Sequence, residues 1–420
     1  MSKPMGAIPD GFRDQDRMLL IGGFRADALV EAAGDTPLFV YDLGRVADQV
    51  RRFRSAFPGV NLHYAVKANT YAPLLNHVAK LVDGLDVASA GEMDSALASG
   101  TAAADISFAG PGKRDDELAA AIAAGVTLNL ESEGEAERAL AIARAQGRTP
   151  RLAIRVNPDF EIKGSGMRMG GGAKPFGIDA ARVPALIRRV VESGADWRGL
   201  HIFAGSQALS AEALVEAQRA TVALAAELAG AAAAKPPMVN LGGGFGIPYF
   251  ATETPLDVEA VGAALAQTLR ERPAILADSG FAIELGRWLV GEAGVYLTRI
   301  VDRKRSHGKT FLVTDGGMHH QLAASGNFGQ VVRRNYPVAI AGRFGAEPEE
   351  EASIVGCLCT PLDRLADDVM LPRAEVGDLV AVFLAGAYGL SASPAAFLGH
   401  PPALEMAVGE ERRTPDRVRG

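Results

Sequence analysis

Between about residue 40 and residue 285, short apolar runs alternate with stretches that have a helical pattern. The runs end near eight positions, which are Lys67, Val87, Phe108, Leu130, Val156, Phe203, Leu241 and Glu284. Eight strands with helices between them are typical of a closed (β/α)8 barrel, and the length of the region fits the roughly 250 residues usual for that fold. The alternation therefore predicts a TIM-like barrel of the α/β class over residues 42–285.

Polar residues mark the starts of several helices in this region. Ser89 is followed three residues later by Glu92, and Ser132 by Glu135, which is the capping-box pattern of a helix N-terminus. The alanine-rich stretch 211–234 has a high helix propensity, and we interpret it as a helix that packs on the barrel.

The sequence changes character after Glu284. Three stretches that alternate as strands do, with glycine and proline turns between them, are 294–301, 309–314 and 377–383. Residues 286–420 are therefore predicted to form a C-terminal all-β domain. Residues 1–41 are expected to form an N-terminal arm, loose or partner-bound over residues 1–20, whose last segment, 37–41, adds a strand to that domain.

The composition limits the kinds of partner that the chain can have. Its 420 residues suffice for two domains with a large core, and its formal net charge of −7 argues against a general nucleic-acid role. No apolar stretch is long enough to span a bilayer and no signal-peptide pattern is seen, so we expect no membrane role and a reducing cytoplasmic setting. Cys357 and Cys359 lie one residue apart, a spacing that favours neither a disulfide between them nor a metal site.

Lys67 closes the apolar run that begins at His63, and Ala68 and Asn69 follow it at once. The pattern predicts a buried strand that brings one amine to its C-terminal end, where barrel enzymes carry their active residues. A lysine buried there is either paired with an acid or has chemistry of its own, such as a Schiff base with an aldehyde cofactor.

Other residues suited to chemistry lie at the ends of further runs. Gly242–Gly246 follows Leu241, and glycines let backbone N–H groups point at a phosphate, although a tight turn explains such a run equally well. Glu284 needs a cation or donor if it is buried, and a protonated pyridine nitrogen would supply one. His201 and Arg287 have ordinary alternatives, as a core histidine and a structural ion pair. Taken together, these residues describe a pyridoxal-phosphate site.

The order of these motifs resembles that of the fold-type III pyridoxal-phosphate decarboxylases, which include the diaminopimelate, ornithine and arginine decarboxylases. The resemblance runs in order over residues 36–405. It rests on the segments His63–Asn69, Asp86–Glu92, Asn240–Gly246, Glu284–Arg287, Thr314–Met318, Cys357–Cys359 and Gly386–Gly389. It implies an alanine racemase-like barrel followed by a β-domain, in agreement with the fold predicted from the residues themselves.

The resemblance also implies a role for each matching residue. Lys67 resembles the Schiff-base lysine, His201 the imidazole stacked on the cofactor ring, and Glu284 the partner of the pyridine nitrogen. The other residues that it implies in cofactor binding, several of them as phosphate ligands, are Asp86, Ser206, Gly243, Gly244, Gly286, Arg287 and Tyr388. Cys359 resembles the cysteine that acts across a dimer interface and protonates the quinonoid intermediate, and Asp363 is expected to reach the same partner site. A homodimer with shared active sites is therefore expected.

The residue that faces the pyridine nitrogen separates two reaction classes. A glutamate favours full protonation of the ring, which suits loss of carbon dioxide because two electrons must pass into the ring. Alanine racemase shares the barrel but has an arginine in that place, so Glu284 favours an amino-acid carboxy-lyase over a racemase. A non-catalytic cofactor carrier of the same fold would be the barrel alone, without Cys359 or Tyr388.

Positions that would bind the substrate depart from the family pattern. Thr360 follows Cys359 where diaminopimelate enzymes have a glutamate, and Ala323 stands where they have an arginine that binds the distal carboxylate. Diaminopimelate and ornithine are both disfavoured, because a site loses affinity when such a partner is missing. Three segments resemble instead a sub-branch of the family, namely Met318–His320, Leu358–Pro361 and Phe397–Pro401. Members of this sub-branch act on glutamyl groups of an acyl-carrier protein or are encoded with exosortase systems.

The predicted substrate is accordingly an amino acid or an aminoacyl group on a carrier protein. The alternatives are diaminopimelate decarboxylation in lysine biosynthesis and racemisation by the same fold. His319 and His320 are adjacent, and adjacent side chains on a strand point to opposite faces, so no metal site is predicted.

Overall fold

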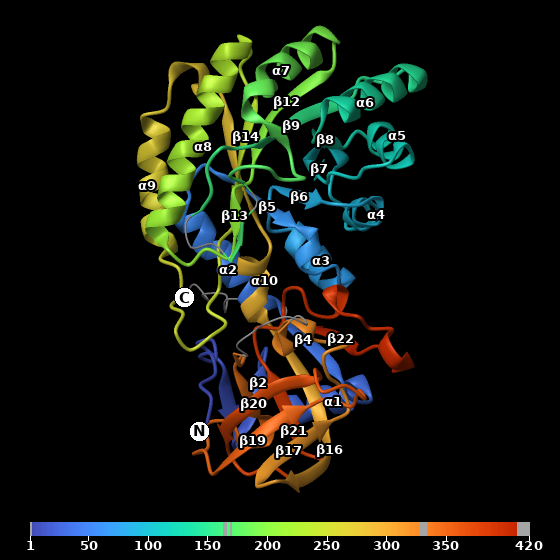
Figure 1. Ribbon diagram of the computed structural model, residues 1–420, viewed down its shortest axis with the longest axis vertical. Helices are drawn as coiled ribbons and strands as arrows, with labels where there is room; N and C mark the ends of the chain where they lie inside the picture. Colours follow the sequence, from blue (N-terminus) through green and yellow to red (C-terminus); the bar gives the residue numbers. More distant parts are fainter. Residues whose placement is uncertain (1, 163–165, 169, 327–333, 410–420) are drawn as a thin grey trace, which may run out of the picture. The chain divides into compact units, whose positions relative to one another are not determined.

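The structure is a computed structural model that describes residues 2–162, 166–168, 170–326 and 334–409. The chain forms two compact units, which are described separately (Figure 1). The barrel unit comprises Gln49–Ile247 and Pro255–Trp288, and the β-rich unit comprises Met1–Asp48, Pro248–Thr254 and Leu289–Gly420. These units follow spatial packing, so their limits differ by several residues from the domain boundaries that the sequence places after residues 41 and 285.

Eight parallel strands close the barrel. Their order is β9-β12-β14-β15-β5-β6-β7-β8, and pairing of β8 with β9 completes the ring. The strands are β5 (Asn61–Ala65), β6 (Gly84–Val87), β7 (Ile106–Phe108), β8 (Thr127–Leu130), β9 (Arg151–Asn157), β12 (Asp196–Ile202), β14 (Met238–Gly243) and β15 (Gly280–Leu285). The predicted barrel is thereby confirmed. Short strands β10 (Met167–Arg168) and β13 (Gly205–Ser206) pair with each other, and β11 (Ile178–Asp179) extends the sheet beside β9.

Helices cover the outside of the barrel, and α8 and α9 lie side by side (Figure 1). They are α3 (Ala72–Ala79), α4 (Ala90–Ala98), α5 (Asp115–Ala124), α6 (Glu133–Gln146), α7 (Val183–Glu192), α8 (Ala211–Ala232) and α9 (Val258–Arg270). Two helices span the limits of the units, α2 (Leu43–Ala56) and α10 (Arg287–Val290). The alanine-rich stretch forms α8 as predicted.

The two predicted helix caps are present, with one difference. Ser89 Oγ accepts a hydrogen bond from the Glu92 amide at 3.2 Å, and Ser132 Oγ accepts one from the Glu135 amide at 3.0 Å. Each glutamate, however, reaches one residue further back than a capping box requires. The Glu92 carboxylate accepts from the amide of Ala88 at 2.8 Å, and the Glu135 carboxylate accepts from that of Glu131 at 3.2 Å. Both serines still satisfy amides that the helix itself leaves without partners.

The β-rich unit is built on β16 (Gly294–Ser306), a long strand that pairs with three others. The remaining strands of its sheet are β4 (Leu38–Asp42), β17 (Lys309–Thr314), β18 (Val338–Ile340), β19 (Glu350–Val355), β20 (Arg364–Leu371), β21 (Leu379–Val382) and β22 (Leu404–Val408). β4 lies between β16 and β22, antiparallel to the first and parallel to the second. The short helix α11 (Leu322–Ser325) follows β17.

The N-terminal segment is not a loose arm within this unit. Strands β1 (Arg13–Gln15), β2 (Met18–Ile21) and β3 (Phe24–Arg25) form a small antiparallel sheet, and helix α1 (Ala26–Ala33) follows. Leu19 and Ile21 are fully buried, which explains why the segment is ordered. Each of these strands has only two to four residues, too few for an alternating pattern to reveal it.

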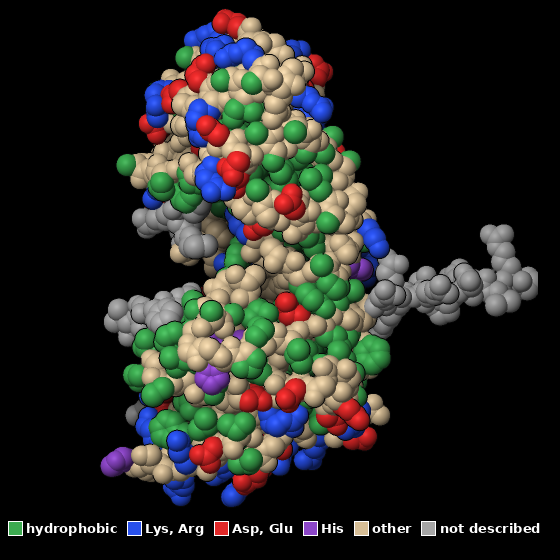
Figure 2. All heavy atoms as spheres, turned by 90° about the vertical axis from the view of Figure 1, so that its right-hand side faces the viewer, with side chains coloured by type: hydrophobic (Ala, Val, Ile, Leu, Met, Phe, Trp, Pro, Cys, Tyr) green, Lys and Arg blue, Asp and Glu red, His purple; other side chains and the backbone are tan. Residues whose placement is uncertain are grey.

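The surface carries charges of both signs. Figure 2 shows Lys and Arg side chains interleaved with Asp and Glu side chains on the face that it draws. Within the described ranges, no helix has both the length and the apolar character needed to cross a bilayer.

Candidate active site

Lys67 does not lie on the predicted strand but in the turn that directly follows it. β5 ends at Ala65, and Val66–Ala68 form a short 3₁₀ turn. Val66 and Ala68 are buried, whereas the Lys67 side chain is 47% exposed. The prediction of a buried lysine was therefore wrong, because the turn leaves this side chain exposed although both of its neighbours in sequence are buried. The amine still lies at the C-terminal end of a barrel strand, where barrel enzymes place reactive groups.

Glu284 is the acid nearest to that amine in the barrel. Its Oε1 atom lies 3.9 Å from Lys67 Nζ, and its Oε2 atom lies 3.0 Å from Nε2 of His201. Burial alone would raise the pKa of Glu284, but the hydrogen bond and charge of His201, with the charges of Lys67 and Arg155, lower the pKa to about 2. Glu284 is thus an ionised carboxylate held in the barrel interior.

The other ring nitrogen of His201, Nδ1, is buried and has no hydrogen-bond partner among the described residues. Buried polar atoms in native proteins are nearly always paired. His201 and Glu284 are both less than 10% exposed, so this unpaired atom lies in a polar interior rather than at the surface.

A second acid–imidazole pair follows on the next strands. His63 of β5 has Nδ1 3.2 Å from Oδ1 of Asp86 on β6, and Ser107 Oγ donates to the same oxygen at 2.5 Å. Oδ2 of Asp86 is buried without a hydrogen-bond partner in the described ranges. The sequence prediction included Asp86 but missed His63. His63 and Lys67 are four residues apart, a spacing that strand alternation alone would have placed on one face.

The predicted phosphate-binding glycines lie where backbones come very close together. A Cβ atom on Gly243 would lie 1.8 Å from the carbonyl oxygen of Glu284, and one on Gly244 would lie 2.3 Å from that of Gly205. Gly286 similarly allows the Lys67 turn to pack, because its Cβ would lie 2.8 Å from that of Ala68. These glycines are therefore required by packing, whether or not they also contact a phosphate.

The order of strands brings these residues to one end of the barrel. His201, Gly243, Glu284, Lys67 and Asp86 come from, or directly follow, β12, β14, β15, β5 and β6, which are consecutive neighbours in the sheet. Two further predicted residues are in the same unit: Ser206 on β13, and Arg287, half-buried at the start of α10.

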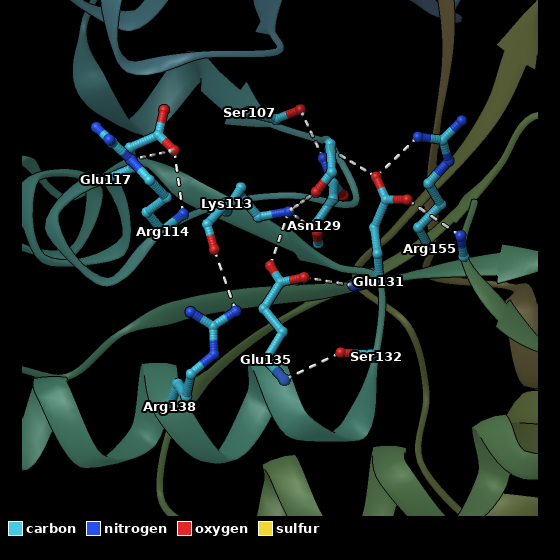
Figure 3. Close-up of polar contacts among 12 residues, drawn as sticks. Ser107, Lys113, Arg114, Glu117, Asn129, Glu131, Ser132, Glu135, Arg138 and Arg155 are labelled. Atoms are coloured by element: carbon cyan, nitrogen blue, oxygen red, sulfur yellow. Dashed lines mark hydrogen bonds and ion pairs between the residues drawn. The ribbon is translucent and has the colours of Figure 1, made fainter. Parts of the chain in front are cut away.

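A buried ionic network adjoins this end of the barrel and was not predicted (Figure 3). Lys113 Nζ lies 2.7 Å from Glu135 Oε1 and donates to two backbone carbonyls. Glu131 accepts hydrogen bonds from Arg155 at 2.8 Å and from the amide of Gly177 at 3.1 Å. All four charged residues are less than 10% exposed, so the stability of each charge depends on its ionic partner.

We expect Lys113→Met to lower the free energy of unfolding of the barrel by about 3–5 kcal/mol, because it leaves buried carboxylate charge uncompensated. The double variant Lys113→Met/Glu135→Leu should recover much of this loss, since it removes the pair together. Both tryptophans, Trp197 and Trp288, belong to the barrel unit, so their fluorescence during urea unfolding reports on this unit. A double variant as unstable as the single one would contradict this view of the pair.

Two predicted residues, Cys359 and Tyr388, lie in the β-rich unit. Cys359 is exposed in the segment between β19 and β20. Tyr388 is half-buried after β21 and has a left-handed backbone, with φ of 53°. Such a conformation is strained for a residue other than glycine and is common at functional sites. Their catalytic and phosphate-binding roles stay predictions.

Asp363 does not reach outward as expected. It is 2% exposed, and its carboxylate accepts hydrogen bonds from the amides of Met318 at 2.7 Å and Leu358 at 2.8 Å. A Cβ atom on Gly317 or Gly356 would lie 2.2 Å from this carboxylate, which explains the glycines at both places. Asp363 therefore joins two loops inside its own unit.

His319 and His320 lie in a turn after β17, not on a strand, so the reasoning that placed them on opposite faces was wrong. Their ring centroids are 3.7 Å apart, and the centroid of His400 lies 5.3 Å from that of His319. Even so, within the part of the chain that the structure describes, no group of three or more potential ligands is arranged to hold a metal ion.

The acid stability of the β-rich unit should depend on His319. Burial, with the neighbouring His320 and His400 charges, lowers the pKa of His319 from 6.5 to about 4. In the unfolded chain His319 is protonated below about pH 6.5, whereas in the folded chain it stays neutral down to about pH 4. The burial of neutral His319 therefore contributes its full stabilisation above pH 6.5, and this stabilisation is lost as the pH falls toward 4. Between these values, the urea midpoint measured by circular dichroism should fall more in the wild type than in His319→Asn. Equal falls would contradict the burial of a neutral imidazole.

Comparison with known proteins relates this geometry to a family. The family profile described as "Pyridoxal-dependent decarboxylase, pyridoxal binding domain" matches residues 43–291. The L-glutamyl-[BtrI acyl-carrier protein] decarboxylase of Niallia circulans is 37% identical, over 89% of this chain and 88% of that protein. A diaminopimelate decarboxylase of Archaeoglobus fulgidus is 31% identical, over 96% and 94%. Among solved structures, the diaminopimelate decarboxylase from M. jannaschii in complex with L-lysine aligns with a TM-score of 0.84 and 26% identity, over 95% of this chain and 93% of that one.

Proposed function

Because this chain belongs to the family of pyridoxal-dependent decarboxylases, we propose that it removes the α-carboxylate of an amino acid, or of an aminoacyl group on a carrier protein. Pyridoxal 5′-phosphate, when bound, supplies an electron sink for the electron pair that remains as carbon dioxide leaves. The observation that carries the proposal is the Lys67 amine 3.9 Å from the ionised carboxylate of Glu284.

The residues of the barrel suit this cofactor. Lys67 would hold its aldehyde carbon through the amine. Glu284, whose pKa is lowered to about 2, would accept a hydrogen bond from the protonated pyridine nitrogen. Nδ1 of His201 and Oδ2 of Asp86 are buried without a partner among the described residues, so they could form hydrogen bonds with the ring or its substituents. The resemblance assigns the phosphate to Ser206, Gly243, Gly244 and Arg287 in the barrel unit and to Tyr388 in the β-rich unit.

A racemase of the same barrel is the alternative that Glu284 disfavours. An ionised carboxylate keeps the facing nitrogen protonated, which assists departure of carbon dioxide. The test is to incubate the holoenzyme with candidate amino acids and to measure both carbon dioxide and optical inversion. Carbon dioxide without inversion supports the proposal, and inversion without carbon dioxide would replace it with racemisation.

The substrate assignment favours a carrier-linked or otherwise unusual amino acid. Ala323 and Thr360 offer no charge to a distal group of diaminopimelate, although relatives named as diaminopimelate decarboxylases are 31% identical. We therefore expect kcat/KM for diaminopimelate to be lower than for a glutamyl group on a carrier protein by at least about 10²-fold. Competition between the two substrates measures this ratio directly, and a preference for diaminopimelate would make the chain an enzyme of that reaction.

We further propose a homodimer in which Cys359 delivers a proton to the partner's site, in keeping with its exposure within one chain. Mixing inactive Lys67→Ala and Cys359→Ala subunits should then restore activity, up to about a quarter of the wild-type value if subunits pair at random. No recovery from a mixture shown to contain mixed dimers would place each site within one chain. A cytoplasmic location belongs to the same proposal, and the two free cysteines are compatible with it.

A further inference from the structure

Four polar side chains form one hydrogen-bonded row across neighbouring strands of the barrel unit. Asn129 of β8 donates through Nδ2 to Oγ of Ser107 on β7 at 3.0 Å (Figure 3), and Ser107 Oγ donates to Oδ1 of Asp86 on β6 at 2.5 Å. His63 of β5 ends the row, with Nδ1 3.2 Å from the same oxygen. Barrels of this kind are usually filled by bulky apolar side chains, so a polar row across four strands calls for a specific reason.

The row leaves one oxygen of Asp86 without a partner. Oδ1 accepts from Ser107, and because a carboxylate only accepts, Nδ1 of His63 carries the hydrogen in its contact with that oxygen. Oδ2 is buried and has no hydrogen-bond partner among the described residues. Hydrogen bonds that served only to join strands would not explain this atom, because burial of an unpaired polar atom is costly. The row therefore fixes the orientation of Asp86 and leaves Oδ2 as a ready acceptor.

The sequence of β6 is suited to this position of the His63 ring. His63 pairs in register with Gly84, and Asp86 lies two residues further along the same strand, on the same face. A Cβ atom on Gly84 would lie 2.9 Å from both Cε1 and Nε2 of His63, and 2.7 Å from the carbonyl oxygen of Asp105. Gly84 thus provides the space across which the imidazole reaches the carboxylate, and a larger residue there would push the ring away.

The surroundings of His63 favour its charged form. Burial lowers the pKa of His63, but the charge of Asp86, the hydrogen bond to it, and the charges of Glu284 and Asp83 outweigh burial and raise the pKa above its usual value of 6.5. Asp86 lies on β6 and Asp83 just before it, whereas Glu284 is paired in register with His63 on β15. Lys67, which follows β5, is the cation of the same segment. An imidazolium at residue 63 therefore offsets part of the negative charge at this end of the barrel.

We propose that His63 is a positioning residue of the active site, whose imidazolium holds Asp86 with Oδ2 available to the bound cofactor and offsets the negative charge that an anionic cofactor meets there. The inference rests on the proposed function, because pyridoxal 5′-phosphate is the anion concerned. It adds a pH dependence to that site. His63 is charged below its raised pKa, and the charge is lost as the pH rises through that pKa. Its contribution to binding should therefore be largest in mildly acidic solution and should disappear in alkaline solution.

The test measures binding of pyridoxine 5′-phosphate to the full-length protein freed of cofactor, by calorimetry from about pH 6 to about pH 9. This analogue has the ring and the phosphate of the cofactor but no aldehyde, so it forms no covalent link to Lys67. His63→Asn keeps a donor near the place of Nδ1 and cannot be charged. The dissociation constant of His63→Asn divided by that of the wild type should be about ten at the acidic end and should approach about one at the alkaline end. Titration of the phosphate affects both proteins equally and cancels in this ratio.

Further variants separate the charge of His63 from the orientation of Asp86. Ser107→Ala removes the other donor to Oδ1 without changing any charge, so it should weaken binding by a few-fold factor that is the same at every pH. His77→Asn is the matched control, because His77 is a half-buried histidine of α3 in the same unit and lies outside the row. It should bind the analogue as the wild type does. His63→Gln, which is also polar and uncharged, gives the same comparison if His63→Asn does not fold.

A ratio above one that is the same at every pH would show a purely structural role for His63 and would overturn the proposal, as would a ratio of one throughout. Failure of the wild type to bind the analogue at all would overturn the proposed function together with this inference. If the wild type binds the analogue with the expected pH-dependent ratio but releases no carbon dioxide from any amino acid, the role of His63 stands and the decarboxylase assignment falls.

Discussion

Lys67→Ala should release no measurable carbon dioxide, a loss of about a thousandfold or more in kcat. The reason is that Lys67 provides the amine at the C-terminal end of β5, 3.9 Å from the carboxylate of Glu284. The variant should also retain less pyridoxal phosphate after gel filtration, since the covalent link is lost. Carbon dioxide release and visible absorbance, measured on the same samples, report the two effects.

Lys235→Ala is the matched control for this substitution. Lys235 lies in the same unit, has an exposed side chain and pairs with Asp278 at 3.0 Å. This variant should match the wild type in both measurements, because surface ion pairs contribute little. Substantial activity in Lys67→Ala, with the cofactor retained, would remove Lys67 from the mechanism.

Glu284→Gln should lower kcat by about 10²–10³-fold while leaving the cofactor bound. The amide keeps the shape of the side chain but carries no negative charge. In the wild type, His201, Lys67 and Arg155 stabilise that charge on Glu284 against the effect of burial. A neutral partner no longer favours the protonated pyridine nitrogen, so the electron sink is weaker. The cofactor content is measured by absorbance before each assay, so that loss of chemistry is separated from loss of binding.

The control for Glu284→Gln is Glu259→Gln. Glu259 is largely exposed and pairs with Arg52 at 2.8 Å on the outside of the barrel unit. It should have wild-type kcat. Activity of Glu284→Gln within a few-fold of the wild type would show that the charge of Glu284 does not assist the reaction.

The barrel was predictable because its signal is local. Most strands are short apolar runs, several helices begin with a recognisable cap such as Ser89 or Ser132, and eight repeats suffice to close the ring. The end of β5 was harder to predict. The turn of Val66–Ala68 depends on close packing of Ala68 against Gly286, more than 200 residues away in sequence, and local alternation contains no information on such a contact.

Pairs of distant charged residues were missed for the same reason. Lys113 lies just before α5 and Glu135 lies in α6, and nothing in either local sequence indicates that they are buried together. Asp363 was assigned an outward role, whereas its carboxylate is satisfied by amides from two loops. His63 was missed as well, because its contact with Asp86 joins β5 to the neighbouring strand β6 and neither local sequence shows it.

The most direct test of the account is to find which lysine holds the cofactor. The holoenzyme is reduced with borohydride, which fixes pyridoxal phosphate to the amine that binds it, and the digested protein is mapped by mass spectrometry. We expect the added mass on the peptide that contains Lys67. The same mass on another lysine, such as the buried Lys113, or a cofactor-loaded protein with no modified lysine, would contradict it.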